Sequence, residues 1–102
     1  MKHGLSTDTV AGIHSVLARF PAIESAVLYG SRAKGNFKHG SDIDLTLHGN
    51  DLTTAQLADI ADALDDLLLP YTIDLSIFAT LDHTELREHI ERVGVVFYAR
   101  AA

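Results

Sequence analysis

Two long segments of the chain carry apolar residues at the spacing of an amphipathic helix. The first segment follows Ser6, a suitable N-cap, and it ends before Pro21 because the residue preceding a proline avoids the helical region. The second segment begins with the capping-box pair Thr53 and Gln56 and runs toward Pro70. Its predicted apolar stripe consists of Leu57, Ile60, Ala61, Leu64 and Leu68.

A third helix is predicted near the end of the chain. Asp82 and Glu85 open it, and Gly94 is expected to cap it. Its apolar positions are Leu86, Ile90 and Val93.

Short extended segments separate the predicted helices. "SAVLYG" (25–30) is typical of a buried strand, whereas "DIDLTLH" (42–48) and "YTIDLSIFA" (71–79) alternate apolar and polar residues, as half-buried strands do. "VVFYA" (95–99) is a candidate final strand. We therefore predict one α/β domain over residues 1–102, with a small sheet whose apolar face is covered by helices.

Composition narrows the class of protein. The 102 residues are 47% hydrophobic and 22% charged, which is typical of an ordinary globular domain. The absence of cysteine excludes disulfides and thiolate metal sites. The net charge of −6 argues against general nucleic-acid binding. With no apolar run of membrane-spanning length and no signal peptide at the N-terminus, we expect a cytoplasmic protein that does not enter membranes.

Three aspartates occupy the polar positions of two predicted strands. Asp42 and Asp44 are two residues apart and should share a face, and Asp74 has the same setting in "TIDLS". If the two strands are neighbours, the three carboxylates converge and require a cation to offset their repulsion. Oxygen ligands of this kind favour Mg²⁺ or Mn²⁺, and a site for two ions is typical of phosphoryl displacement.

The loop before the first aspartates has the complementary charge. Gly30 allows close approach of a phosphate, Ser31 offers a hydroxyl and an amide, and Arg32 and Lys34 add positive charge. The loop is not a Walker A motif, because Ser41 stands where the lysine should be. We infer a site for a nucleoside triphosphate with its magnesium ions.

Each of these signals has an ordinary structural explanation. Alternating aspartates are often the solvated face of an antiparallel sheet, and Gly-Ser after a strand is often only a turn. The acidic cluster Asp59, Asp62, Asp65 and Asp66 reads as a solvated helix face, with docking to a basic partner as the alternative. His83 and His89 lack metal-ligand spacing and are expected on the surface. Order and spacing together favour the nucleotide site.

"GSRAKG", "SDIDL" and "IDLSIF" together resemble the minimal nucleotidyltransferases of the DNA polymerase β-like superfamily. The pattern of that superfamily is Gly-Ser, about ten intervening residues, Asp-x-Asp and a later strand carboxylate. It falls on Gly30, Ser31, Asp42, Asp44 and Asp74. The resemblance covers nearly the whole chain and implies a mixed sheet packed on helices.

The resemblance also implies a reaction, in which a nucleoside monophosphate passes from a nucleoside triphosphate to a hydroxyl. Asp42 and Asp44 would bind both metal ions, and Asp74 would complete the metal site and help activate the hydroxyl. Gly30 and Ser31 would hold the terminal phosphates, assisted by Arg32.

Small proteins of this kind resemble the antitoxin of a toxin–antitoxin pair whose partner is a helical HEPN-domain toxin. The resemblance implies a hetero-oligomer in which AMP from ATP is transferred to a tyrosine of that toxin. Two alternatives remain at this point: an antitoxin that neutralises its toxin by steric binding without catalysis, and a nucleotidyltransferase acting on a small molecule such as an aminoglycoside.

Overall fold

The computed structural model describes residues 3–38 and 40–101. Its elements in chain order are α1 (Thr7–Ala18), β1 (Ser25–Tyr29), α2 (Ser31–Lys34), β2 (Ile43–His48), α3 (Thr54–Asp65), β3 (Ile73–Ile77), the 3₁₀ turn η1 (Phe78–Thr80), α4 (Thr84–Val93) and β4 (Val95–Ala99). The order predicted from the periodicity of the sequence is confirmed, including the final strand. Two short helical elements that the pattern did not predict, α2 and η1, are added to it.

The four strands form one mixed sheet in the order β3-β2-β1-β4. β1 pairs antiparallel with β2 and with β4, whereas β2 pairs parallel with β3. The parallel pair is joined through α3, as parallel neighbours require a crossover connection. The mixed sheet implied by the resemblance is therefore present, and the two aspartate-bearing strands are direct neighbours.

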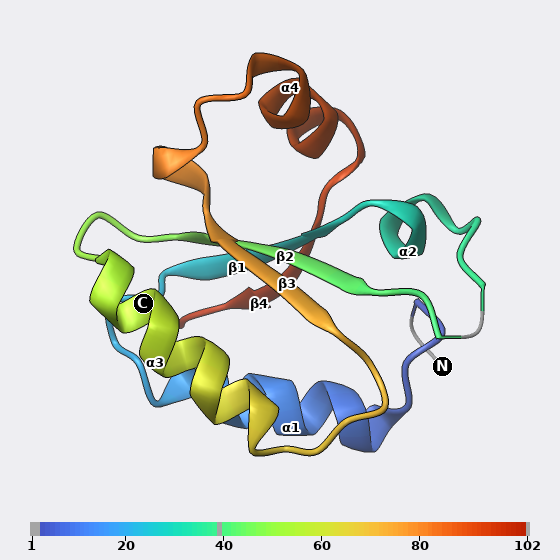
Figure 1. Ribbon diagram of the computed structural model, residues 1–102, viewed down its shortest axis with the longest axis horizontal. Coiled ribbons are helices and arrows are strands. Elements are labelled where there is room, and N and C mark those ends of the chain that lie inside the picture. Colours follow the sequence, from blue (N-terminus) through green and yellow to red (C-terminus); the bar gives the residue numbers. More distant parts are fainter. Residues whose placement is uncertain (1–2, 39, 102) are drawn as a thin grey trace.

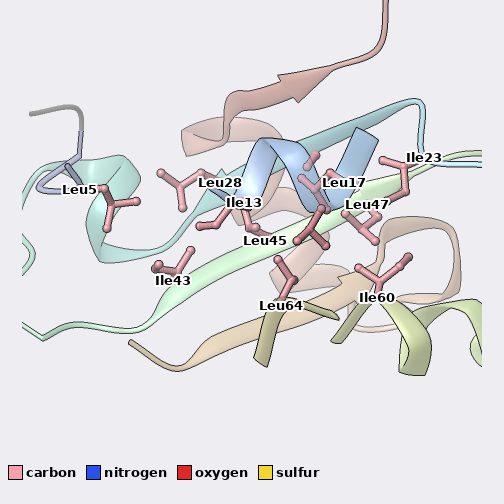
Figure 2. Packing of buried hydrophobic residues seen from close by; sticks show 12 residues of the cluster. Leu5, Ile13, Leu17, Ile23, Leu28, Ile43, Leu45, Leu47, Ile60 and Leu64 are labelled. Carbon is pink, nitrogen blue, oxygen red and sulfur yellow. The ribbon is translucent and has the colours of Figure 1, made fainter. Parts of the chain in front are cut away.

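One face of the sheet carries the main hydrophobic core. α1 and α3 lie side by side on this face (Figure 1). Figure 2 shows their apolar side chains meeting those of β1 and β2. The fully buried members of this cluster are Leu5, Ile13, Leu17, Ile23, Ala26, Leu28, Ile43, Leu45, Leu47 and Ile60. Burial of this kind contributes about 25 cal/mol per Å² of apolar surface and fixes which face of β2 turns outward.

α4 lies on the opposite face of the sheet (Figure 1). The prediction that the helices cover the apolar face is correct for α1 and α3 and wrong for α4. The ring of His89 in α4 meets the ring of Tyr29 edge-on, with 6.4 Å between the ring centroids. This separation lies within the range of about 4.5–7 Å that aromatic pairs prefer. Gly94 approaches the side chain of Val27, and Ile90 is only 3% exposed. Val27 and Tyr29 provide the apolar patch on which this helix packs.

The starts of α1 and α3 agree with the predicted caps, whereas α4 begins at Thr84 with His83 as its N-cap, and the end of α3 differs from the prediction. Ser6 accepts a hydrogen bond from the Thr9 amide, and Thr53 and Gln56 form a complete capping box. α3 ends at Asp65, so Leu68 lies beyond the helix with φ +54° and is 88% exposed. Its assignment to the buried stripe is wrong, because the chain leaves the helix one turn earlier than Pro70 suggests.

Candidate functional site

The parallel register of β2 and β3 places Asp44 directly beside Asp74. Tyr29 is the partner of Asp44 on the other side, in the antiparallel pairing of β1 with β2. Paired residues of neighbouring strands project to the same face and lie about 5 Å apart. The three side chains therefore form a row across the face that carries α4.

Asp42 comes just before this row. The alternation predicted that Asp42 lies within the strand. In the structure β2 begins at Ile43, so Asp42 is an exposed residue at the entrance of the strand. Its negative charge nevertheless contributes to raising the pKa of Asp44. Asp44 and Asp74 are thus paired on the polar face, and Asp42 lies at the entrance of β2.

The electrostatics of this face are those of a site with surplus negative charge. The pKa of Asp44 is raised from its ordinary value by burial first, then by the charges of Asp74 and Asp42, and is lowered in part by His89. The pKa of the Tyr29 phenol is raised mainly by burial and then by Asp74, an effect that the Ser76 hydroxyl partly opposes. A cation bound among these groups would relieve both effects.

Gly30 is required by its backbone and by its neighbour. It has φ +77° and ψ −155°, a region that is open essentially to glycine alone. A Cβ at this position would overlap Asp44 Oδ2, so the carboxylate of the second motif rests against the backbone of the first. Ser31 follows as the first residue of α2 and is half-buried.

Arg32 is placed differently from the other predicted residues. Its side chain is 2% exposed, and its guanidinium donates to the carbonyls of Ser41 and His3. The sequence predicted a phosphate contact for this residue. The observed contacts give Arg32 a backbone partner on each side of the loop and offer no support for that role.

Two residues near the carboxylates were not assigned to the site from the sequence. Tyr29 belongs to the segment expected to form a buried strand, and it is indeed buried, but it lies beside Asp44. His89 was expected on the surface and is instead half-buried against Tyr29. For Tyr29 the sequence offered a signal: it lies directly before Gly30 of the motif and two residues after Val27, so the two side chains share one face of the strand. For His89 no signal existed, because its position depends on which face α4 covers.

The donor set fits a hard divalent cation. Carboxylate oxygens are the ligands that Mg²⁺ and Mn²⁺ prefer, and such a cation would offset the charges of Asp74 and Asp42, which add to burial in raising the pKa of Asp44. Within residues 3–38 and 40–101, no three His, Cys, Asp or Glu side chains are already gathered closely enough to hold a metal ion. The Asp44–Asp74 pair is in place, and Asp42 stands at its entrance.

None of the helices in the described residues is long and apolar enough to cross a bilayer.

Several solved structures share this fold. A toxin–antitoxin structure with AMP-PNP is 22% identical with a TM-score of 0.72, covering 89% of this chain and 73% of that one. A complex of tri-AMPylated Shewanella oneidensis HEPN toxin with MNT antitoxin is 19% identical with a TM-score of 0.69, covering 94% and 74%. A toxin–antitoxin complex called MntA-HepT is 20% identical with a TM-score of 0.68, covering 93% and 74%.

A search of curated protein sequences finds no match. A comparison with profiles of protein families does give a family. The profile of the family described as "Polymerase beta, Nucleotidyltransferase" matches residues 12–102, which include both motifs and the third aspartate. The chain belongs to the polymerase β nucleotidyltransferase family.

Proposed function

We propose that this nucleotidyltransferase transfers AMP from ATP to a hydroxyl of a HEPN-domain toxin and thereby acts as its antitoxin. The observation that carries the proposal is the pairing of Asp44 with Asp74 directly behind Gly30. It places two carboxylates beside the loop to which the family motif assigns the triphosphate.

Each motif residue has a role in this proposal. Asp42, Asp44 and Asp74 hold Mg²⁺ as two ions, for which Mn²⁺ can substitute. Bound there, the metal supplies positive charge for the triphosphate and the attacking oxygen. Gly30 and Ser31 hold the terminal phosphates through their backbone and hydroxyl groups, because Gly30 has no side chain to keep a phosphate at a distance.

The proposed reaction is an in-line displacement. The acceptor oxygen forms a bond to the α-phosphorus of ATP, the bond from that phosphorus to the α–β bridging oxygen breaks, and pyrophosphate leaves. The proton of the acceptor hydroxyl passes to Asp74 or to water. Asp74 suits this role because it is exposed at the edge strand β3, where a second protein can approach it.

The proposals for the acceptor and for the partner protein rest on the structural neighbours. One neighbour was solved with AMP-PNP, and another contains a tri-AMPylated HEPN toxin in complex with its MNT antitoxin. By analogy we propose a hetero-oligomer with a HEPN toxin, with ATP as the nucleotide and a tyrosine of the toxin as the acceptor. The fold similarity supports this partner more than a small-molecule acceptor such as an aminoglycoside.

The test is incubation of the protein with ATP, Mg²⁺ and the candidate HEPN partner, followed by intact mass measurement of the partner. We expect a mass gain of one or more AMP units with the wild type and none with the Asp42→Asn/Asp44→Asn double variant. Asp51→Asn is a matched control, since Asp51 is an exposed aspartate outside the sheet. A stable complex that neutralises the toxin with no mass gain would contradict the proposal and identify a steric antitoxin.

A further inference from the structure

Among the described residues, Arg32 is the one charged residue whose side chain is buried. Its Nε and Nη2 both donate to the carbonyl oxygen of Ser41, at 3.1 and 2.9 Å. Its Nη1 donates to the carbonyl oxygen of His3 at 2.8 Å. The two-pronged contact with one carbonyl uses the fixed fork of a guanidinium, which lysine cannot reproduce.

Two aromatic rings complete the surroundings of this guanidinium. Its central carbon lies 5.1 Å from the ring centre of Phe37 and 4.9 Å from that of Tyr71. Phe37 lies in the loop after α2 and Tyr71 in the segment before β3, so Arg32 contacts both of these parts of the chain as well as the N-terminal segment at His3. Gly4, with φ +76°, lets the N-terminal segment close over the same group, where a Cβ would overlap the Phe37 ring.

Ser41 is the residue directly before Asp42, and its backbone is held from several sides. Besides the two bonds from Arg32, the Ser41 amide donates to the Lys38 carbonyl and the Ser41 hydroxyl accepts from the Lys38 amide. On the other side of Asp42, the amide of Ile43 donates to the Thr72 carbonyl at 2.9 Å. Asp42 therefore projects from a short piece of backbone that is anchored at both ends, although its own side chain is exposed.

We propose that Arg32 is a positioning residue for Asp42: it holds the Ser41 carbonyl so that the Asp42 carboxylate joins Asp44 and Asp74 at the metal site. The inference rests on the metal roles assigned under the proposed function. It replaces the phosphate contact expected for Arg32, because a side chain whose donors are directed at backbone carbonyls, and which is 2% exposed, does not reach a bound triphosphate.

The two roles for Arg32 predict different defects in Arg32→Lys. If Arg32 positions Asp42, the affinity for metal falls about tenfold, as is typical when a residue supporting a ligand is changed. The KM for ATP at saturating Mg²⁺ then stays near the wild-type value. If Arg32 binds phosphate instead, the KM for ATP rises and the metal requirement is unchanged. Arg19→Lys is the matched control, because Arg19 is exposed at the end of α1 and the same substitution there should change affinity less than about twofold.

The experiment is a Mn²⁺ titration followed by electron paramagnetic resonance of the free ion, on wild type, Arg32→Lys and Arg19→Lys. The Mg²⁺ dependence of AMP transfer and the KM for ATP are measured on the same proteins. Equal Mn²⁺ affinity in Arg32→Lys and Arg19→Lys would overturn the inference. Absence of AMP transfer by the wild type would overturn the proposed function, whereas the Mn²⁺ titration would still test Arg32.

Circular dichroism establishes whether Arg32→Lys is folded. If Arg32→Lys is not folded, the titration is made on Phe37→Leu instead. This substitution removes one of the two rings against the guanidinium and keeps the donors and acceptors of the three hydrogen bonds of Arg32. We expect Phe37→Leu to weaken Mn²⁺ binding in the same direction and less strongly. Wild-type Mn²⁺ affinity in a folded Phe37→Leu variant would overturn the inference.

Discussion

Asp44 of β2 and Asp74 of β3 occupy directly paired positions in two parallel strands, so their carboxylates share one face of the sheet. Like charges placed side by side in this way oppose folding unless something neutralises them. The position is held because the other face of β2 is fixed by the buried side chains of Ile43, Leu45 and Leu47. The core thus maintains an arrangement that is electrostatically unfavourable without a cation.

Asp44→Asn should stabilise the protein in the absence of divalent metal. Because the pKa of Asp44 is raised in the folded state, the folded protein binds more protons than the unfolded chain between the ordinary value of 3.8 and the raised one. The wild-type free energy of unfolding therefore falls as pH rises through this window. We expect the variant and the wild type to be equally stable below that window, with the variant more stable above it.

Urea unfolding of both proteins in EDTA over a range of pH measures this difference. Asp51→Asn, in which an exposed aspartate is changed and Asp44 is kept, is the control, and its free energy of unfolding should follow that of the wild type at each pH. A variant that is less stable than the wild type at neutral pH would contradict the electrostatic account of the site.

Divalent metal should reverse the order of stability. A ligand that binds only the folded state adds RT ln(1 + [L]/Kd) to the free energy of unfolding, about 2.7 kcal/mol at one hundred times Kd. Added Mn²⁺ should therefore raise the melting temperature of the wild type and leave that of Asp44→Asn/Asp74→Asn unchanged. Scanning calorimetry with and without Mn²⁺ tests this. An equal shift in both proteins would place the metal elsewhere.

Gly30→Ala should cost both stability and activity. The backbone at Gly30 lies in a region that costs other residues about 1–3 kcal/mol, and the new methyl group would also push Asp44 from its place. Gly35→Ala is the control, because Gly35 has φ +84° and no heavy atom within 4 Å of the added Cβ. Gly35→Ala should lose stability but keep its rate of AMP transfer. Denaturant midpoints and rates of AMP transfer separate the two, and equal transfer rates in both variants would contradict the role given to Gly30.

Much of the fold could be predicted because local periodicity and burial agree. Alternation in "DIDLTLH" and "YTIDLSIFA" follows directly from a sheet with one buried face, and Thr53 with Gln56 marks the start of α3 through bonds local to four residues. The same alternation placed Asp44 and Asp74 at polar positions of their strands, and they are paired because the two strands are neighbours and in register.

Other features depend on contacts between distant segments and left no local signal. Arg32 is buried because Tyr71 and His3 meet around it, although it lies in a loop rich in glycine and basic residues. α4 lies on the polar face, where His89 meets Tyr29 and Gly94 approaches Val27, and its own helical pattern cannot distinguish this packing from packing on the main core. The early end of α3 appears only in the structure, where the helix ends at Asp65 and Leu68 has a left-handed backbone.

Leu64 and Leu68 share one helical stripe in the sequence but should respond differently to truncation. Leu64 is 3% exposed within the core, and its replacement by alanine should cost about 2–5 kcal/mol. Leu68 is 88% exposed, so Leu68→Ala should change the free energy of unfolding by less than about 0.5 kcal/mol. Urea unfolding at neutral pH measures both. Similar losses in the two variants would show that α3 continues to Leu68.

Which phosphate of ATP reaches the HEPN partner tests the central claim most directly. The protein, its partner and Mg²⁺ are incubated with ATP labelled either at the α- or at the γ-phosphate, and the label on the partner is measured after gel separation. Nucleotidyl transfer predicts label from the α position alone, lost in Asp74→Asn and kept in Asp51→Asn. Label from the γ position, or none from either position while the complex forms, would contradict the account.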